Sequence, residues 1–164
     1  MGKRGPAAKP VAERFWPKVD VRGPDECWVW TAAKYYNGYG VFRVSGHNTT
    51  AHRMAYELTY GQSPGALHVD HTCFTHSCCN PKHLRLATNK QNMENRSGVQ
   101  RNNTSSGVRG VTRSRCGRWQ AQVQHNKKVI YLGTFDSIEE AGEVARVARL
   151  NLFSHNDSDM LLIT

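Results

Sequence analysis

Side chains that bind metal ions are concentrated in one segment of the chain, residues 68–96. Cys73, Cys78 and His83 are separated by four residues in each case, and they supply three of the four thiolate or imidazole ligands that a structural zinc site requires. The fourth ligand must come from elsewhere, and we expect it to be Cys27, which lies beside two tryptophans. The sequence therefore predicts a structural Zn²⁺ site.

This ligand set has rivals that spacing alone leaves open. Cys79 could replace Cys78, and His76 is a further candidate. The alternative is that the cysteines are small buried apolar side chains. A site closed by four protein ligands has no open position for a substrate. We therefore expect zinc to hold short strands together rather than to take part in catalysis.

Asp70, His71 and Asn92 provide side chains for chemistry close to the cysteines in the sequence. Mg²⁺ (or Mn²⁺) binds oxygen ligands and keeps several waters, so the Asp70 carboxylate, the Asn92 amide and a substrate phosphate would suffice. The imidazole of His71 could take a proton from an attacking water, while the metal polarises the scissile phosphate. This combination predicts a metal-dependent nuclease.

The charge of the chain favours a polyanionic partner. Its formal net charge is +9 and its pI is near 9.6. Residues 82–128 carry eleven lysines and arginines but one acidic side chain, Glu94. A solvated surface usually mixes both signs, so this bias predicts binding to double-stranded DNA. Because only 38% of the residues are hydrophobic, small units braced by metal are expected rather than one large core.

Composition also bears on location. No apolar run is long enough to cross a membrane, and the first ten residues lack the apolar stretch of a secretory signal. Five cysteines without such a signal suggest metal binding in a reducing compartment, with Cys116 left as a free thiol. We therefore expect no membrane partner and a cytoplasmic location, in the host cell if the protein is phage-encoded.

Local patterns predict the elements that must position these residues. Residues 51–60 have a helical period closed by Gly61, and Asn37-Gly38 predicts a hairpin turn. Strands are expected at 67–71 and 83–87, followed by a helix capped by Thr88. Three further strands (108–112, 118–124 and 128–133) and a helix from Ser137 to about residue 152 come next. The predicted segments are a flexible basic arm (1–12), a nuclease domain (13–98), a linker (99–107), a DNA-binding domain (108–152) and a tail (153–164).

The first of these domains resembles the HNH endonucleases, in particular a zinc-containing branch similar to His-Cys box homing endonucleases and phage HNH nucleases. The matching motifs are Asp70-His71-x-Cys73, Cys78-x-Asn80-Pro81-x-His83-Leu84, Asn92-x-x-Asn95 and, upstream, Ala51-His52-Arg53. The resemblance implies a ββα-metal fold with one divalent ion. It assigns His71 as general base, Asn92 and Asp70 as ligands of the catalytic metal, and Cys27, Cys73, Cys78 and His83 as zinc ligands. Arg53 would contact a phosphate, with packing as the alternative, and Asn89 and Asn95 compete with Asn92.

Residues 104–150 resemble the plant ethylene-response-factor domain, also called Apetala-type. The matching motifs are Val108-Arg109-Gly110-Val111, Gly117-Arg118-Trp119-x-Ala121 and Tyr131-Leu132-Gly133-Thr134-Phe135. The resemblance implies a three-stranded antiparallel sheet with one helix, and a sheet that enters the major groove. Thr112, Ser114 and Val129 replace arginines of that family, so its base preference is not carried over. The predicted DNA-binding residues are Arg96, Arg109, Arg113, Arg115, Arg118, Trp119, Gln122, Gln124, Lys127, Lys128 and Tyr131.

These observations predict an α+β protein in which a small zinc-stabilised ββα-metal nuclease domain precedes a sheet-plus-helix DNA-binding domain. The predicted activity is metal-dependent hydrolysis of phosphodiester bonds in double-stranded DNA. The alternative is a non-catalytic, sequence-specific DNA-binding protein that uses the HNH fold as a zinc scaffold, which would need neither His71 nor Asn92. Cutting both strands with a single-site nuclease would favour a homodimer. The sequence does not specify the DNA target.

Overall fold

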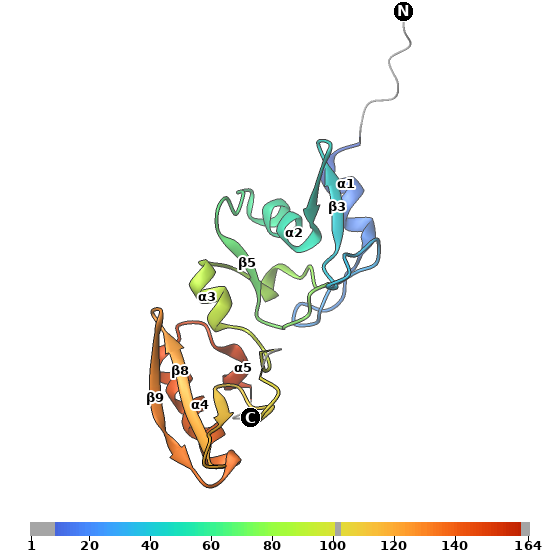
Figure 1. Ribbon diagram of the computed structural model, residues 1–164. Coiled ribbons are helices and arrows are strands. Elements are labelled where there is room, and N and C mark those ends of the chain that lie inside the picture. Colours follow the sequence, from blue (N-terminus) through green and yellow to red (C-terminus); the bar gives the residue numbers. More distant parts are fainter. Residues whose placement is uncertain (1–8, 101–102, 162–164) are drawn as a thin grey trace, which may run out of the picture. The chain divides into compact units, whose positions relative to one another are not determined.

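The computed structural model describes residues 9–100 and 103–161, and these residues divide into two compact units with the boundary between Thr88 and Asn89 (Figure 1). Most of the predicted basic arm, two residues of the predicted linker and the end of the predicted tail lie outside the described residues. The predicted nuclease domain ended at residue 98, ten residues beyond this boundary. The helix α3 (Asn89–Glu94) therefore belongs to the second unit.

The first unit is built on an aromatic core. The helix α1 (Val11–Phe15) leads through a 3-10 turn (Trp16–Lys18) into β1 (Val19–Asp20), which pairs antiparallel with β2 (Val29–Trp30). Phe15 and Trp30 are fully buried, and the ring of Phe42 packs edge-on against both. Such edge-to-face contacts stabilise aromatic cores beyond the effect of burial alone.

The hairpin of the first unit lies later in the chain than predicted. A tight turn does occur at Asn37-Gly38, where the amide of Gly38 donates to the Tyr35 carbonyl oxygen at 2.9 Å, but only an isolated bridge flanks it. The paired strands are β3 (Val41–Val44) and β4 (His47–Thr50). Ser45 and Gly46 join them with positive φ angles of 48° and 82°, as a two-residue hairpin turn requires.

The helix α2 (Ala51–Tyr60) has the predicted bounds and ends at Gly61, whose φ of 67° is left-handed. After it, β5 (His68–His71) and β6 (Leu84–Ala87) form an antiparallel pair, with the cysteine loop and a 3-10 turn (Pro81–His83) between them. The predicted order of strand, metal-binding loop, strand and helix is therefore confirmed as an order of elements.

The second unit contains a three-stranded antiparallel sheet in the order β7 (Val111–Arg113), β8 (Trp119–His125) and β9 (Lys128–Phe135). Asn126 and Lys127 join β8 to β9 with φ angles of 49° and 64°. The helix α4 (Ile138–Leu152) packs small alanines against Val111 and Ala121, and α5 (Asp157–Met160) follows it.

The general expectation of a mixed α+β protein with small sheets is confirmed. Three strands and a helix are also what the plant-domain resemblance implied, although so simple a topology does not identify a family. The hydroxyl of Ser137 accepts hydrogen bonds from the amides of Glu139 and Glu140, as its predicted role at the start of α4 requires. None of the described helices is long and apolar enough to span a membrane.

The core of the first unit offers a direct test at Gly40. A Cβ atom there would lie 2.6 Å from the Trp30 ring and 2.7 Å from the Ala51 Cβ. Both neighbours are buried, so we expect Gly40→Ala to lower the free energy of unfolding by about 1–3 kcal/mol. Urea unfolding followed by tryptophan fluorescence measures this change. The control is Gly23→Ala, because its Cβ would approach mainly the end of the exposed Glu26 side chain, which can turn away. Equal stability of the two variants would contradict this packing.

Candidate metal centre and active site

Three cysteines and one histidine of the first unit gather around a common centre. The ligand atoms of Cys27, Cys73, Cys78 and His83 all lie within 4.8 Å of one another. The Nδ1 atom of His83 lies 3.7 Å from the sulfur of Cys27 and 3.6 Å from the sulfur of Cys78. Tetrahedral zinc, with bonds of about 2.3 Å to sulfur and 2.0–2.1 Å to nitrogen, separates such atoms by about 3.6 Å. The cluster, which unites the four residues predicted from the sequence, could therefore hold a zinc ion.

Backbone pairing explains how Cys27 reaches residues some fifty positions later. The amide of Cys79 donates to the Trp28 carbonyl oxygen at 2.7 Å, so the cysteine loop pairs with the start of β2. The buried side chain of Asn80 also donates to the Glu26 carbonyl oxygen at 2.7 Å. These contacts fix the segments on either side of Cys27.

The thiols of this cluster compete for ionisation. A hydrogen bond from Cys78 lowers the pKa of the Cys73 thiol to about 4. The hydrogen bond with Cys73, together with burial, raises the pKa of Cys78 far above its usual range. A divalent cation removes this conflict because it stabilises every thiolate that it binds. The donor chemistry therefore fits a metal ion.

The rival ligands have other surroundings. Cys79 is fully buried in the core of the first unit, and burial raises the pKa of its thiol to about 12. It is thus the cysteine that behaves as a small apolar side chain. The imidazole of His76 stacks on Tyr39 with ring centroids 4.5 Å apart, and its Nδ1 lies 2.8 Å from the Asn37 carbonyl oxygen. Cys116 is exposed in the second unit, away from these ligands in the chain.

His71, at the end of β5, has the environment of a general base. Its imidazole is 5% exposed, and Nε2 lies 3.1 Å from the Cys78 carbonyl oxygen. A carbonyl can only accept a hydrogen bond, so Nε2 carries the ring proton in this arrangement and Nδ1 carries the lone pair. Burial lowers the pKa of His71, although the hydrogen bond to Cys78 opposes this effect. The ring is therefore neutral near pH 7, as proton abstraction requires.

Asp70 lies directly opposite Arg85 in the β5–β6 pair. The Nε and Nη2 atoms of Arg85 lie 3.2 and 3.1 Å from the Asp70 Oδ2 atom. The sequence assigned no individual role to Arg85, although opposite charges on facing strand positions would have suggested one once the register was known. The role of Asp70 as a metal ligand stays a prediction, and the structure adds a cation that balances its charge.

Rings to which the sequence assigned no role pack beside His71. The ring centroid of His52 lies 4.7 Å from that of His71, and Tyr39 lies 5.1 Å from His52. Burial lowers the pKa of His52 to about 3, with smaller contributions from His71 and Arg53, and burial raises the pKa of Tyr39. Both side chains are therefore uncharged near pH 7, and their rings pack beside the imidazole of His71.

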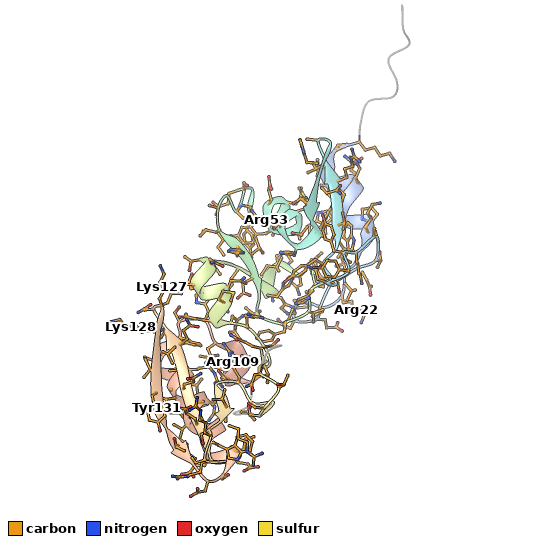
Figure 2. The ribbon with its side chains drawn as sticks, in the orientation of Figure 1. Arg22, Arg53, Arg109, Lys127, Lys128 and Tyr131 are labelled. Atoms are coloured by element: carbon orange, nitrogen blue, oxygen red, sulfur yellow. The ribbon has the colours of Figure 1, made fainter. Side chains whose placement is uncertain are left out.

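Arg53 is engaged with the backbone. Its guanidinium donates to the carbonyl oxygens of Leu67 at 2.7 Å and Gly65 at 3.0 Å, which fixes the loop that enters β5 (Figure 2). These contacts favour the packing alternative, and phosphate binding by Arg53 stays a prediction.

The three asparagines proposed for the catalytic metal differ in their surroundings. Asn89 is exposed and Asn92 is half-buried, both on α3. Asn95 is 2% exposed, and its Oδ1 accepts a hydrogen bond from the Asp157 amide at 2.9 Å. Asn95 is therefore used in packing, and Asn92 stays the predicted ligand.

Several predicted DNA-binding residues share one face of the sheet in the second unit. Gln122 lies opposite Tyr131 and Gln124 lies opposite Val129, on the face that alternates with the buried Ala121. Tyr131 is 57% exposed. Lys127 and Lys128 are exposed at the β8–β9 turn, at one end of the sheet (Figure 2).

Three of the predicted arginines lie on or beside the β7–β8 turn. The guanidinium of Arg113 lies 5.7 Å from the centroid of the Trp119 ring, and Trp119 itself packs against the core. Arg118 forms an ion pair with Asp136 at 2.7 Å, while Arg115 is exposed in the β7–β8 turn. DNA contacts by these residues stay a prediction.

Arg109 is turned inward. Its guanidinium donates to the carbonyl oxygens of Arg96 at 2.6 Å and Glu94 at 2.9 Å, and burial lowers its pKa. The sequence had grouped it with the DNA-binding residues of the open sheet face, on the basis of the plant family. Arg96 has an exposed side chain.

A groove of about 760 Å³ runs along the second unit. Its lining includes Lys90, Arg96 and Lys127 together with the amide side chains of Gln122 and Gln124. Positive charges beside amide groups suit contacts to phosphates and to base edges.

The comparison with known families concerns the segment that holds these predicted catalytic residues. Residues 49–94 match the family model of the HNH endonucleases. This HNH match extends from the end of β4 to the end of α3 and therefore contains Asp70, His71 and Asn92. It also contains three of the four clustered ligands, whereas Cys27 precedes it. The resemblance of residues 104–150 to the plant domain lies beyond the HNH match and stays a prediction.

Two proteins of Escherichia phage T7 are similar to the chain. Protein 7.7 is 43% identical over 70 residues, which cover 43% of this chain and 54% of that protein. Protein 2.8 is 35% identical over 68 residues, which cover 40% of this chain and 45% of that protein. The chain thus spans about half the length of these relatives. No solved structure gives a significant match. The HNH match supports a nuclease or nucleic-acid-related function, and HNH nucleases use a divalent metal.

Substitution of single cysteines tests the metal centre. We expect the purified chain to contain about one zinc ion, and Cys78→Ser to lose it, because a tetrahedral structural site needs all four ligands. Since metal binding contributes to folding, this variant should also melt at a lower temperature. Elemental analysis and thermal unfolding measure both effects.

Cys79→Ser and Cys116→Ser are the controls for metal content. Both should retain zinc, because neither sulfur belongs to the cluster. Loss of zinc from Cys79→Ser with retention in Cys78→Ser would reverse the assignment.

Proposed function

We propose that this chain is an HNH-type DNA endonuclease that hydrolyses phosphodiester bonds in double-stranded DNA with the help of a divalent metal. The observation that carries the proposal is the imidazole of His71, which is buried, held in one tautomer by the Cys78 carbonyl and located within the HNH match. A purely structural zinc module has no need for an oriented neutral imidazole beside its cluster.

In this proposal His71 takes a proton from the attacking water through Nδ1, because Nε2 is held by the Cys78 carbonyl oxygen. Asp70 and Asn92 provide a carboxylate and an amide oxygen for Mg²⁺ or Mn²⁺. The divalent ion, when bound, supplies charge stabilisation at the scissile phosphate. Arg85 pairs with the Asp70 carboxylate at 3.1 Å and orients it. The Cys27, Cys73, Cys78 and His83 cluster holds structural zinc and takes no part in the reaction.

The second unit would bind the DNA. Gln122, Gln124 and Tyr131 provide the face that contacts bases, and lysines at the β8–β9 turn contact phosphates. The basic groove of this unit supports the same role. Because the two similar proteins come from a phage, we expect the enzyme to act in the cytoplasm of an infected host cell. Double-strand cutting would involve a homodimer.

The second candidate function is sequence-specific DNA binding without catalysis. The net charge and the exposed polar sheet face favour DNA binding under either hypothesis. The two candidates differ in whether His71 matters, because a scaffold protein would bind DNA equally well without the imidazole.

Cleavage of supercoiled plasmid tests the nuclease. We expect nicked or linear products only when Mg²⁺ is added, and a loss of about 10²–10⁴-fold in rate for His71→Ala, the usual contribution of a general base. Reactions without added Mg²⁺ are preferable to chelation, which would also strip zinc.

The control is His47→Ala, which removes an exposed imidazole on β4 and should cut at the normal rate. Equal zinc content in the variants shows that they are folded. If the wild type shifts plasmid and phage DNA in gels but cuts neither with any divalent ion, the non-catalytic candidate is preferred.

The salt dependence of DNA binding tests the lysines at the β8–β9 turn. Each phosphate contact contributes about 0.9 to the slope of log K against log salt concentration. We therefore expect the double variant Lys127→Gln, Lys128→Gln to reduce this slope by about 1.8 in fluorescence anisotropy titrations of duplex DNA. Lys18→Gln, at an exposed position of the first unit, should leave the slope unchanged. An unchanged slope in the double variant would show that Lys127 and Lys128 do not contact DNA phosphates.

A further inference from the structure

The C-terminal end of α3 is held by an arginine of the second unit. The guanidinium of Arg109 donates to the carbonyl oxygens of Glu94 and Arg96. The last carbonyls of a helix lack partners within the helix, and a cation there also interacts favourably with the helix dipole. Arg109 thus acts as a side-chain cap for α3.

The side chain of Glu94, the last residue of α3, is hydrogen-bonded to the segment after α4 and lies beside the end of β8. It is only 6% exposed. Its Oε1 atom lies 3.2 Å from Nζ of Lys90, and Nδ1 of His125 at the end of β8 approaches it at 3.4 Å without forming a hydrogen bond. Its Oε2 atom lies 3.4 Å from both the amide nitrogen and the hydroxyl of Ser154, after α4. This buried carboxylate therefore connects α3 to the segment after α4 through Ser154, and it packs beside the end of β8.

Arg109 is itself fixed from behind. Its carbonyl oxygen accepts a hydrogen bond from Nη1 of Arg149 at 2.9 Å. Arg149 is buried and forms two hydrogen bonds of 2.7 Å with Asp159 of α5. The ring of Phe153 lies 5.7 Å from the Arg109 guanidinium. The cap therefore has little freedom to turn outward.

We propose that Arg109 and Glu94 are positioning residues that fix α3, and with it Asn92, to the second unit. This inference rests on the proposed function, in which Asn92 provides an oxygen to the catalytic metal. It also reassigns Arg109, which the plant-family resemblance had made a DNA contact.

The length of α3 explains why it needs this support. A helix of six residues is far too short to be stable in isolation, so its position comes from its contacts. Asn92 lies two residues before Glu94, within the turn that these contacts hold. A metal ligand displaced by about 1 Å can lower a catalytic rate by about a hundredfold.

Full-length Arg109→Gln tests the inference by separating metal use from DNA affinity. We expect the half-saturating Mg²⁺ concentration for cleavage to rise about tenfold and kcat to fall by up to about a hundredfold. The Kd for duplex DNA without divalent ions should stay unchanged. Arg109→Lys should recover part of the activity, because an ammonium group can still donate to one of the carbonyls. Arg22→Gln, which removes an exposed arginine of the first unit, is the charge-matched control (Figure 2).

A DNA-contact role for Arg109 gives the opposite pattern. The Kd would then weaken and the salt slope fall by about 0.9, while the Mg²⁺ requirement stayed normal. That result would overturn the inference.

Amide hydrogen exchange keeps this test independent of cleavage. The Asn95 amide donates to the Gln91 carbonyl oxygen at 3.0 Å and so reports on the last turn of α3. We expect this amide to exchange about tenfold faster in Arg109→Gln, the effect of losing a charged hydrogen bond, while β8 amides stay protected. If Arg109→Gln does not fold, Ser154→Ala, which removes one donor to Glu94, should give a smaller acceleration at the same amide.

The exchange result decides the inference even if the wild type cuts no DNA. Unchanged exchange at Asn95 in a folded variant would overturn it. Faster exchange in a chain that never cleaves would support the anchoring of α3, while the proposed nuclease function would fail.

Discussion

The first unit depends on the joining of segments that are distant in sequence at the cysteine–histidine cluster. Cys27 comes from the loop before β2, and the other three ligands come from the loop between β5 and β6. The three sheets that the structure describes in this unit are all two-stranded, and isolated two-stranded pairs are at best marginally stable. A metal ion held by the cluster would compensate for this weakness. Cys78 adds a second connection, because its sulfur belongs to the cluster while its carbonyl oxygen holds the His71 ring. Cys78 therefore belongs to the cluster and also orients the proposed base, His71.

The second unit combines a core of small side chains with a buried ion pair. Its core is formed mainly by small side chains such as Ala121, Ala141 and Ala145, which bury little apolar area each. Beside that core, the Arg149–Asp159 pair is almost fully buried and connects α5 to α4. A buried ion pair is weak evidence for stability, but its directional hydrogen bonds specify one arrangement of the elements around it.

Much of this organisation could be predicted from local sequence signals. The α2 helix with its Gly61 terminus and the start of α4 at Ser137 each depend on neighbouring residues, and each was predicted. Ligand spacing gave three members of the cluster, and Cys27 was found by its neighbouring tryptophans. The β3–β4 turn was assigned to Asn37-Gly38 because that pair has a strong turn preference, while strand pairing across Ser45-Gly46 depends on the core around Phe42.

What could not be predicted depends on tertiary contacts. The partnership of Asp70 with Arg85 needs the strand register, and the packing of His52 against His71 needs the position of α2. The inward contacts of Arg109 could not be predicted for the same reason, since its position in a motif does not reveal that its guanidinium donates to the Glu94 carbonyl oxygen. The polar composition of residues 99–107 placed the predicted linker there. The contacts instead place α3 in the second unit, and composition does not report contacts.

The membership of α3 in that unit has an evolutionary consequence. Recombination that replaced everything after the polar segment at residues 99–107 with another DNA-binding fold would preserve the HNH match but remove the partners of Glu94 and Asn95. Exchange at residues 99–107 would therefore leave α3 without the contacts that hold it. If the proposed DNA contacts hold, new target preferences would instead accumulate through substitutions of Gln122, Gln124 and Tyr131 on the polar face of the sheet.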